Sequence, residues 1–416
     1  MILRNSSNKP IQIDKYRILS QLGKGGFGTV YHVVDVEDDT KKYALKFFTS
    51  TFNLSKIQRQ LKLYEILNTS NLFLKTYLSK KISGSFFLLM EYAEGSSLEK
   101  IVKKDTLLDS SVYKIILDVL DSLEFLHKQG IIHGDVKADN IVKKGECFYL
   151  IDFDVIKLHS PCETLHIEND NDFAAPEIYR GYQTYQSDIY SLGCVVYFML
   201  SAKHIYYFNK DYSFSQKMFA HLYTQQIKDS AISKKMFFLI ERMTEKDPNK
   251  RATIDDIRTI ISNEIAIKDE KKVQEIKDSF EGDFERYRYM ALDGVSYAQN
   301  ILGLLYEKSK NVHDHLKKAL YWYEMAAYQG LVKANFNLGL CYLYAKGTTV
   351  DYSKALQYFN KAAEKEHARS YFYIGLIYEK GLGITSDKNL AEKNYKKSVY
   401  YGYLQAYNKL NDSSKL

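Results

Sequence analysis

The chain has 416 residues, of which 45% are hydrophobic and 26% are charged. This length allows two or three domains, and the composition excludes a wholly disordered chain. The formal net charge of +7 is spread along the sequence without any long block of like charges. We therefore expect neither a nucleic-acid-binding tail nor a polybasic membrane patch.

Cysteine usage and the N-terminus indicate the compartment. The cysteines share no short spacing, so neither a zinc site nor a disulfide framework is expected. The N-terminal segment lacks the apolar core of a signal peptide, and the apolar stretch at 192–200 is about half as long as a membrane-spanning helix. We expect no membrane span and a cytoplasmic protein. A bacterial effector secreted into a host cell by a signal-less route would have the same features.

Strand and helix patterns divide the chain along its length. Apolar segments at 16–22, 42–48 and 85–92 predict strands, whereas helical patterns dominate after position 98. All 4 prolines lie before position 250, and a proline-free remainder is typical of a series of helices. A charged, helix-favouring segment at 263–282 predicts a helical linker between the two parts.

The C-terminal part contains an internal repeat. Gly303, Gly339 and Gly375 recur at intervals of 36 residues, inside ILGLLY, NLGLCY and YIGLIY. Two further sets keep the same interval: Ala319, Ala355 and Ala391, and Tyr323, Phe359 and Tyr395. Each unit holds two amphipathic helical patterns, and a half unit containing Tyr287 precedes the first full one.

Residues 283–410 thereby resemble Sel-one-like repeats, which are relatives of the tetratricopeptide repeat. The resemblance implies an all-α solenoid of helix pairs whose surface binds a protein partner, with a short tail at 411–416. For single residues of the repeat, a packing role explains the pattern.

A glycine-rich segment near the N-terminus predicts a phosphate-binding element. Gly23, Gly25 and Gly28 fit the spacing G-x-G-x-x-G, which is also found in Rossmann turns. A Rossmann turn needs a helix directly after it, but the segment that follows, GTVYHVVDV, has a strand pattern. A glycine-rich hairpin between two strands instead forms a lid whose backbone can lie over nucleotide phosphates.

Lys46 follows in a predicted strand. From Phe47 to Met90 the sequence has a single carboxylate, Glu65, in a helical stretch. If an acid from that helix holds Lys46, Glu65 is the only candidate.

The segment HGDVKADNIV, from His133 to Val142, and the later DFD contain the residue types that phosphoryl transfer requires. Asp135 can orient an attacking hydroxyl, and Lys137 can neutralise charge on the transferred group. Asn140 and Asp152 offer the amide and carboxylate oxygens that Mg²⁺ accepts.

Together with the MEYAEG, AAPE, SDIYSLG and DPNKRAT segments, these motifs resemble a eukaryotic-type protein kinase, and the lysine two residues after Asp135 resembles the serine/threonine branch. The resemblance implies an α+β bilobal fold, with an N-terminal tail at 1–14, a β-rich N-lobe at 15–93 and a helical C-lobe at 94–262. It implies ATP and Mg²⁺ as cofactors and a protein substrate. It also implies that adenine and hinge contacts come from Leu22, Val30, Ala44, Met90, Glu91, Tyr92 and Val142. Finally, Asp188 would anchor the catalytic loop, and Glu177 would pair with Arg251.

Three positions depart from the family pattern. Gly134 stands where most kinases have an arginine that reads a phosphorylated activation loop, so we expect no activation by loop phosphorylation. Asp154 replaces the glycine of the magnesium motif. Asp170 replaces the usual threonine. If it lay near Asp135, repulsion between the two negative charges would raise the pKa of one of these two carboxyl groups.

Three functions are compatible with these residues. The first is an active serine/threonine protein kinase whose repeats select substrates or location. The second is a pseudokinase scaffold that binds ATP and partners without catalysis, although every expected phosphate- and metal-contacting residue is present. The third is a small-molecule phosphotransferase, which would lack the Ala-Pro-Glu element and Arg251. The first interpretation agrees best with the sequence.

Overall fold

The structure, a computed structural model, describes residues 12–25, 28–48, 54–82, 85–153, 157–158, 172–206, 212–262, 280 and 282–413. The chain divides into two compact units, residues 1–101 with 138–154 and residues 102–137 with 155–416. The expected linker helix at 263–282 lies almost entirely outside the described residues.

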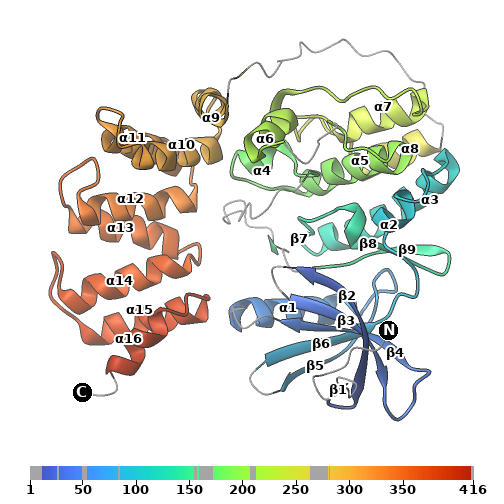
Figure 1. Ribbon diagram of the computed structural model, residues 1–416, viewed down its shortest axis with the longest axis horizontal. Coiled ribbons are helices and arrows are strands. Elements are labelled where there is room, and N and C mark those ends of the chain that lie inside the picture. Colours follow the sequence, from blue (N-terminus) through green and yellow to red (C-terminus); the bar gives the residue numbers. More distant parts are fainter. Residues whose placement is uncertain are drawn as a thin grey trace. The chain divides into compact units, whose positions relative to one another are not determined.

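A curled antiparallel sheet forms the first unit (Figure 1). Its strand order is β1 (Gln12–Ile13), β2 (Tyr16–Gly25), β3 (Gly28–Asp35), β4 (Lys42–Phe48), β6 (Ser85–Glu91) and β5 (Thr76–Ile82). One helix, α1 (Leu54–Leu67), connects β4 to β5, and a separate hairpin joins β8 (Ile141–Lys144) to β9 (Cys147–Leu150). Val33, Leu45 and Phe87 are fully buried in this sheet because alternate residues of each strand face the core.

The second unit begins with short elements and the helices of the C-lobe. Its short elements are α2 (Leu98–Val102), which starts in the first unit, β7 (Ile131–Ile132), β10 (Lys157–Leu158) and α4 (Pro176–Tyr179). The longer helices are α3 (Asp109–Lys128), α5 (Tyr185–Ser201), α6 (Phe214–Tyr223), α7 (Lys234–Met243) and α8 (Ile254–Ile261). Every residue of α5 from Ser187 to Leu200 is buried, which explains the apolar stretch in the sequence. Among the described residues, no helix combines the length and apolarity that crossing a membrane requires.

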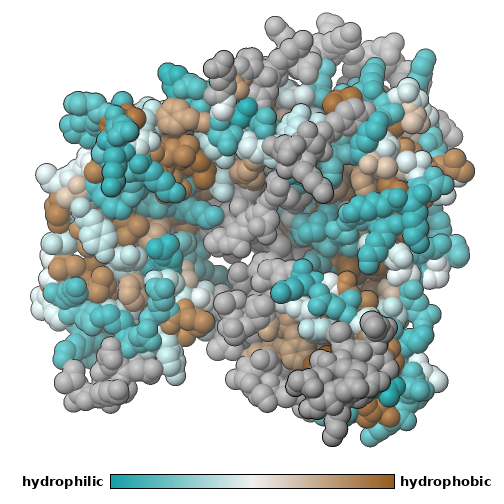
Figure 2. Space-filling view, viewed as in Figure 1, coloured by the Kyte–Doolittle hydropathy of each residue, from teal (hydrophilic) through white to brown (hydrophobic). Residues whose placement is uncertain are grey.

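Paired helices make up the rest of the second unit (Figure 1). They are α9 (Asp283–Leu292), α10 (Ser296–Lys308), α11 (His315–Tyr328), α12 (Val332–Tyr344), α13 (Tyr352–Ala363), α14 (Ala368–Lys380), α15 (Lys388–Tyr400) and α16 (Ala406–Ser413). On the face shown in Figure 2, hydrophilic and hydrophobic side chains alternate over these helices.

The interval of 36 residues reflects a glycine–aromatic contact between the two helices of each pair. A Cβ atom on Gly339 would come within 2.4 Å of the Phe359 ring, and one on Gly303 within 2.6 Å of the Tyr323 ring. Gly375 has the same relation to Tyr395, at 2.7 Å. The glycines therefore admit the ring of the following helix, and the repeat in the sequence is a repeat of packing.

The repeats pack directly on the C-lobe. Asp283, at the start of α9, accepts hydrogen bonds from Ser213 Oγ, at 2.6 Å, and from Ser215 Oγ of α6. Arg286, only 4% exposed, donates to Ser215 Oγ at 2.9 Å and pairs with Asp283 at 3.0 Å. These contacts bury a paired cation between α6 and α9.

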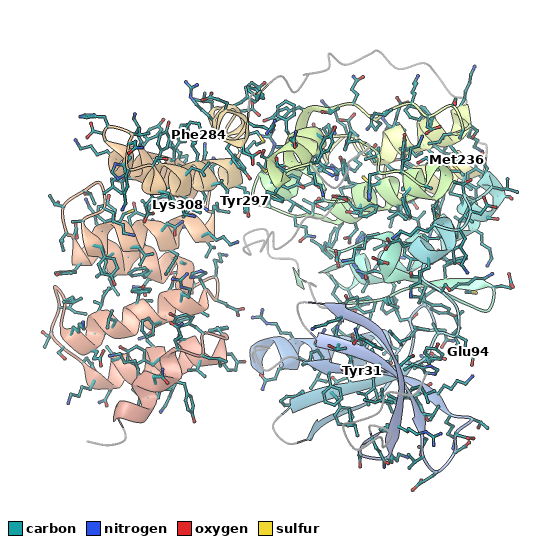
Figure 3. The ribbon with its side chains drawn as sticks, in the orientation of Figure 1. Tyr31, Glu94, Met236, Phe284, Tyr297 and Lys308 are labelled. Atoms are coloured by element: carbon teal, nitrogen blue, oxygen red, sulfur yellow. The ribbon has the colours of Figure 1, made fainter. Side chains whose placement is uncertain are left out.

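Aromatic and polar contacts extend this interface to α10. Phe214 of α6 meets Tyr297 edge to face, with ring centroids 6.0 Å apart, at the N-terminal end of α10, where Figure 3 labels Tyr297. Tyr223 donates to Asp293 Oδ2 at 2.6 Å, and Ser296 Oγ donates to the carbonyl of Arg180 at 2.9 Å. The half repeat and the first helix of the first full unit thus join the solenoid to the C-lobe.

The predicted fold class is confirmed: a β-rich lobe and a helical lobe are followed by an all-α repeat. The strand after the glycine-rich segment is also present as β3, so a Rossmann turn is excluded.

A buried polar network connects α5 to α6 in the C-lobe core. Tyr190 Oη lies 3.0 Å from Nδ1 of His221 and 2.9 Å from Oη of Tyr206. Complete burial holds the pKa of His221 well below its usual value, because a charged imidazole there would lose its hydration.

We predict opposite effects on stability for two changes in one repeat. Gly339→Ala should lower the free energy of unfolding by about 1–3 kcal/mol, because its methyl group overlaps the Phe359 ring. Ala345→Gly should raise it by roughly 1 kcal/mol, because Ala345 caps α12 at a φ of 55°, where Gly381 caps α14. Urea denaturation of both variants measures these free energies. Equal stability of the two variants would contradict the close contact between Gly339 and the Phe359 ring.

Acid should destabilise the C-lobe through His221. Below about pH 6.5 the unfolded chain protonates this imidazole while the folded chain does not, so stability falls by up to about 1.4 kcal/mol per pH unit from this group alone. Above about pH 6.5 the His221 imidazole is neutral in both the folded and the unfolded chain, so it does not make the free energy of unfolding depend on pH. His221→Gln should make the free energy of unfolding less dependent on pH between pH 6.5 and 5, by the contribution of one proton. Urea denaturation at several pH values in this range measures the dependence. Identical slopes in the two proteins would contradict the prediction.

Candidate active site

Lys46 of β4 is held by a carboxylate from the segment after β9. Its Nζ lies 3.1 Å from Oδ1 of Asp152, and Lys46 is only 5% exposed. Asp152 has a φ of 65°, a left-handed conformation that aspartate tolerates better than most residues. The next residue, Phe153, is 6% exposed and packs edge to face on Tyr64 and Phe73, with ring centroids 6.1 and 5.7 Å away. This packing fixes the backbone that presents the Asp152 carboxylate.

The β8–β9 hairpin brings Asn140 beside Asp152. Ile141 pairs with Leu150 at the open end of the hairpin, and the Ile151 N–H donates to the carbonyl of Asn140 at 2.8 Å. Asn140 itself is 5% exposed, in the short 3₁₀ helix Ala138–Asn140. No cluster of three or more His, Cys, Asp or Glu residues forms a metal site among the described residues. One amide and one carboxylate suit Mg²⁺, which usually takes few protein ligands and completes its shell with phosphates and water.

The loop from His133 to Lys137, in the second unit, contains the other predicted catalytic residues. Lys137 Nζ lies 2.7 Å from Asp135 Oδ2, and the two side chains are 34% and 16% exposed. Asp188 of α5, 1% exposed, accepts from the backbone N–H groups of His133 at 3.0 Å and Gly134 at 2.8 Å. A buried carboxylate needs hydrogen-bond donors. The backbone N–H groups of His133 and Gly134 supply two of them, and these bonds hold the loop to α5.

The backbone conformation at position 134 favours glycine. Its φ of 77° is left-handed, and a Cβ atom would lie 2.7 Å from Nε2 of Gln183. A side chain at this position would therefore be strained and crowded. The other two departures from the family pattern, Asp154 and Asp170, lie outside the described residues.

The glycine-rich strands and the neighbouring strands surround Lys46. Gly25 pairs with Gly28 across β2 and β3, and a Cβ atom on Gly28 would lie 2.0 Å from the carbonyl oxygen of Phe47. Gly23 faces open space, and nothing lies within 4 Å of its missing Cβ. The other predicted nucleotide positions in the sheet are in register: Val30 opposite Lys46, and Ala44 opposite Met90. Leu22 is 40% exposed, and Val142 forms a β-bridge with Ser97.

The residues after Met90 are fixed by their side chains. Burial opposes the ionisation of Glu91, but hydrogen bonds from Lys144 and from the backbone of Lys75 outweigh it and lower the pKa of the carboxyl. Tyr92 stacks on His32 with ring centroids 3.9 Å apart. The side chains of Glu91 and Tyr92 thus have contacts of their own, and it is the backbone of these two residues that is expected to bond to adenine.

Glu177 and Arg251 form a bidentate ion pair at 2.8 and 3.0 Å, with both side chains fully buried. Ser187 Oγ also donates to Glu177 at 2.7 Å, and Arg251 donates to the carbonyl of Gln186 at 2.6 Å. Removing one member would leave an unpaired buried charge, so this pair ties α4 to α5 and to the segment before α8.

The expected pairing of Lys46 with Glu65 is wrong. Helix α1 buries Gln60, Leu63, Tyr64 and Leu67, spaced as one helical face, and Glu65 lies on its exposed side. The sequence analysis did not expect Gln60 on the inner face of this helix, where it is 5% exposed. The signal that could have found it is the apolar periodicity of α1, which sets the inner face independently of charge.

The comparisons with known proteins agree with this geometry. Residues 16–260 match the protein kinase domain, and residues 296–331, 332–367 and 368–400 each match the Sel1 repeat.

Several serine/threonine kinases are similar to the chain over its kinase domain. Serine/threonine-protein kinase SIK1 of Rattus norvegicus is 28% identical over 258 residues, which cover 60% of this chain and 33% of that protein. Serine/threonine-protein kinase D of Synechocystis is 28% identical over 58% of this chain and 50% of its own length. PknD of Mycobacterium tuberculosis is 29% identical over 44% of this chain and 29% of its own.

The chain spans half or less of the length of these relatives. The kinase match covers more than half of this chain. The chain therefore belongs to the protein kinase family, with Sel1 repeats following its kinase domain.

Proposed function

We propose that the protein is an ATP-dependent kinase that transfers a phosphoryl group to serine and threonine hydroxyls of protein substrates. The observation that carries this proposal is the 2.7 Å contact between Lys137 and Asp135 on a loop anchored by Asp188. In this role Asp135 orients the substrate hydroxyl and accepts its proton, while Lys137 neutralises charge on the transferred group. The serine/threonine kinases among its relatives support the same substrate chemistry.

Lys46, Asn140 and Asp152 would serve the nucleotide. Lys46 is the buried cation available to the phosphates, and Asn140 with Asp152 would hold Mg²⁺. Bound Mg²⁺ would neutralise charge on the phosphates. Val30, Ala44, Met90 and Val142 would enclose the adenine, and the backbone at Glu91 and Tyr92 would donate and accept its hydrogen bonds.

We propose that the repeats recruit the substrate or a partner protein. Because α9 and α10 pack on α6 and α4, the solenoid is attached to the lobe that contains Asp135. A substrate bound on the repeats would thus be held at a high effective concentration near that lobe.

We also propose a reducing, cytoplasmic compartment. Cys147, Cys194 and Cys341 are free thiols in the described part of the chain. Burial raises the pKa of Cys194 and of Cys341 to about 12, which makes both thiols unreactive.

Loss of either key charge should abolish catalysis. Lys46→Met and Asp135→Asn should each reduce phosphoryl transfer by at least about 100-fold, because each removes a charge or a base that the reaction needs. The measurement is transfer of labelled phosphate from ATP to a generic protein substrate, followed by identification of the labelled residue. Label on serine or threonine with wild-type protein alone supports the proposal. No transfer by the wild type, with intact ATP binding, would favour the pseudokinase scaffold.

Weakening the interface between the C-lobe and the repeats should destabilise the second unit. Asp283→Ala should lower the free energy of unfolding by about 1–3 kcal/mol, because it leaves the buried Arg286 without its carboxylate partner. Glu285→Ala is the matched control, since Glu285 on the same helix pairs with the exposed Arg288 instead of the buried Arg286. Both variants are measured by urea denaturation. Equal stability of the two would show that the interface contributes little.

A further inference from the structure

One groove of the repeats contains a pocket of about 280 Å³, lined by residues of α11, α12 and α13. Its most buried lining residues come from α12: Asn335 is 5% exposed and Leu338 is fully buried. Tyr328 of α11 and Tyr358 of α13 line it from the two neighbouring helices. Because pockets for small molecules begin at about 300 Å³, this volume suits a single side chain better than a cofactor.

The short side chain at position 335 explains why the groove is hollow here. The repeat matches begin 36 residues apart, so Gln299, Asn335 and Tyr371 are equivalent positions. In the first repeat, Gln299 donates to the carbonyl of Ala291 at 3.0 Å and accepts from Nε2 of Gln329 at 2.7 Å. Its amide therefore bridges that groove. Asparagine is one methylene shorter and leaves space at the same place.

The third repeat has a tyrosine ring at the equivalent position. Tyr371 is 9% exposed and stacks on Tyr401, with ring centroids 5.3 Å apart. Nζ of Lys397 lies 5.2 Å from the centroid of the Tyr371 ring. Lys361, which lines the pocket, is the equivalent of Lys397 one repeat earlier. The chain itself thus shows that such a groove can hold an aromatic ring beside a lysine.

Asn335 also has an acceptor without a partner. Its Nδ2 donates to the carbonyl of Leu331 at 3.2 Å, whereas its buried Oδ1 accepts no hydrogen bond from the described residues. A buried acceptor without a donor costs free energy, and in the first repeat Gln329 supplies that donor. A phenol hydroxyl on a guest side chain would supply it here. The Glu324 carboxylate, which also lines the pocket, offers a second acceptor.

We propose that this pocket binds a tyrosine side chain of a partner protein, in the position that Tyr371 takes in the third repeat. The inference rests on the proposed recruitment of a protein by the repeats, and it names the site and the side chain recognised. Tyr358 and Lys361 offer a ring and a cation to the guest ring. Tyr328 is 91% exposed beside the pocket, and a docked segment would cover its ring.

Filling the pocket should remove this binding. The probe is the peptide acetyl-Gly-Gly-Tyr-Gly-Gly-amide, and its affinity for the full chain is measured by titration with saturation-transfer difference NMR. Asn335→Tyr introduces the residue type of the third repeat and should weaken binding at least about tenfold, because its ring occupies the pocket. Asn335→Gln introduces the residue type of the first repeat and should also weaken binding. It keeps the test available if the tyrosine variant does not fold.

Two controls identify the site and the side chain. Asn360→Gln makes the same change at an exposed asparagine of α13 that does not line the pocket, so it should leave the affinity unchanged. The peptide with leucine in place of tyrosine should bind the wild type about fivefold more weakly, because it lacks the aromatic contacts.

Loss of binding in the Asn335 variants alone would support the proposal. No binding of the tyrosine peptide by the wild type, or equal binding of the leucine peptide, would overturn it. Equal affinity of the wild type and both Asn335 variants would also overturn it, because tyrosine would then bind elsewhere, and the proposed recruitment by the repeats would still stand. The peptide contains no serine or threonine and no ATP is added, so the result does not depend on phosphoryl transfer.

Discussion

The burial of α5 is the constraint on which the second unit depends. A helix buried from Ser187 to Leu200 cannot leave its polar groups unpaired, and Asp188 meets this requirement with the backbone of the catalytic loop. In the same first turn of α5, Ser187 and the carbonyl of Gln186 join the Glu177–Arg251 pair. The loop that contains Asp135 and the segment after the activation loop are therefore fixed to the same rigid element.

The same helix relates the C-lobe to the repeats. Tyr190 of α5 contacts His221 of α6, and α6 receives Asp283 and Arg286 from α9. Because Arg286 is buried and paired, separation of α9 from α6 would expose a charge pair and several aromatic rings together. The solenoid is thus part of the packing of the C-lobe.

In the first unit, the distribution of charge around Lys46 differs from the one expected. Its negative partner is Asp152, from the segment that also positions Asn140, and the inner face of α1 presents the neutral Gln60. The packing of Phe153 fixes the backbone beside Asp152, the residue whose carboxylate contacts Lys46.

The sequence by itself determined the two folds and the order of their elements, and it named the residues of the candidate site. The strand after the glycine-rich segment, the interval of 36 residues and the spacing of Asp135, Asn140 and Asp152 are local patterns, and local geometry follows from them directly. Tertiary structure decided that Lys46 contacts Asp152, while the face of α1 that turns inward contains Gln60 and not Glu65. It also decided the left-handed backbone of Gly134 and the packing of α9 on α6. The Lys46–Asp152 contact and the packing of α9 on α6 join segments far apart in the chain, and neither spacing nor composition encodes such contacts.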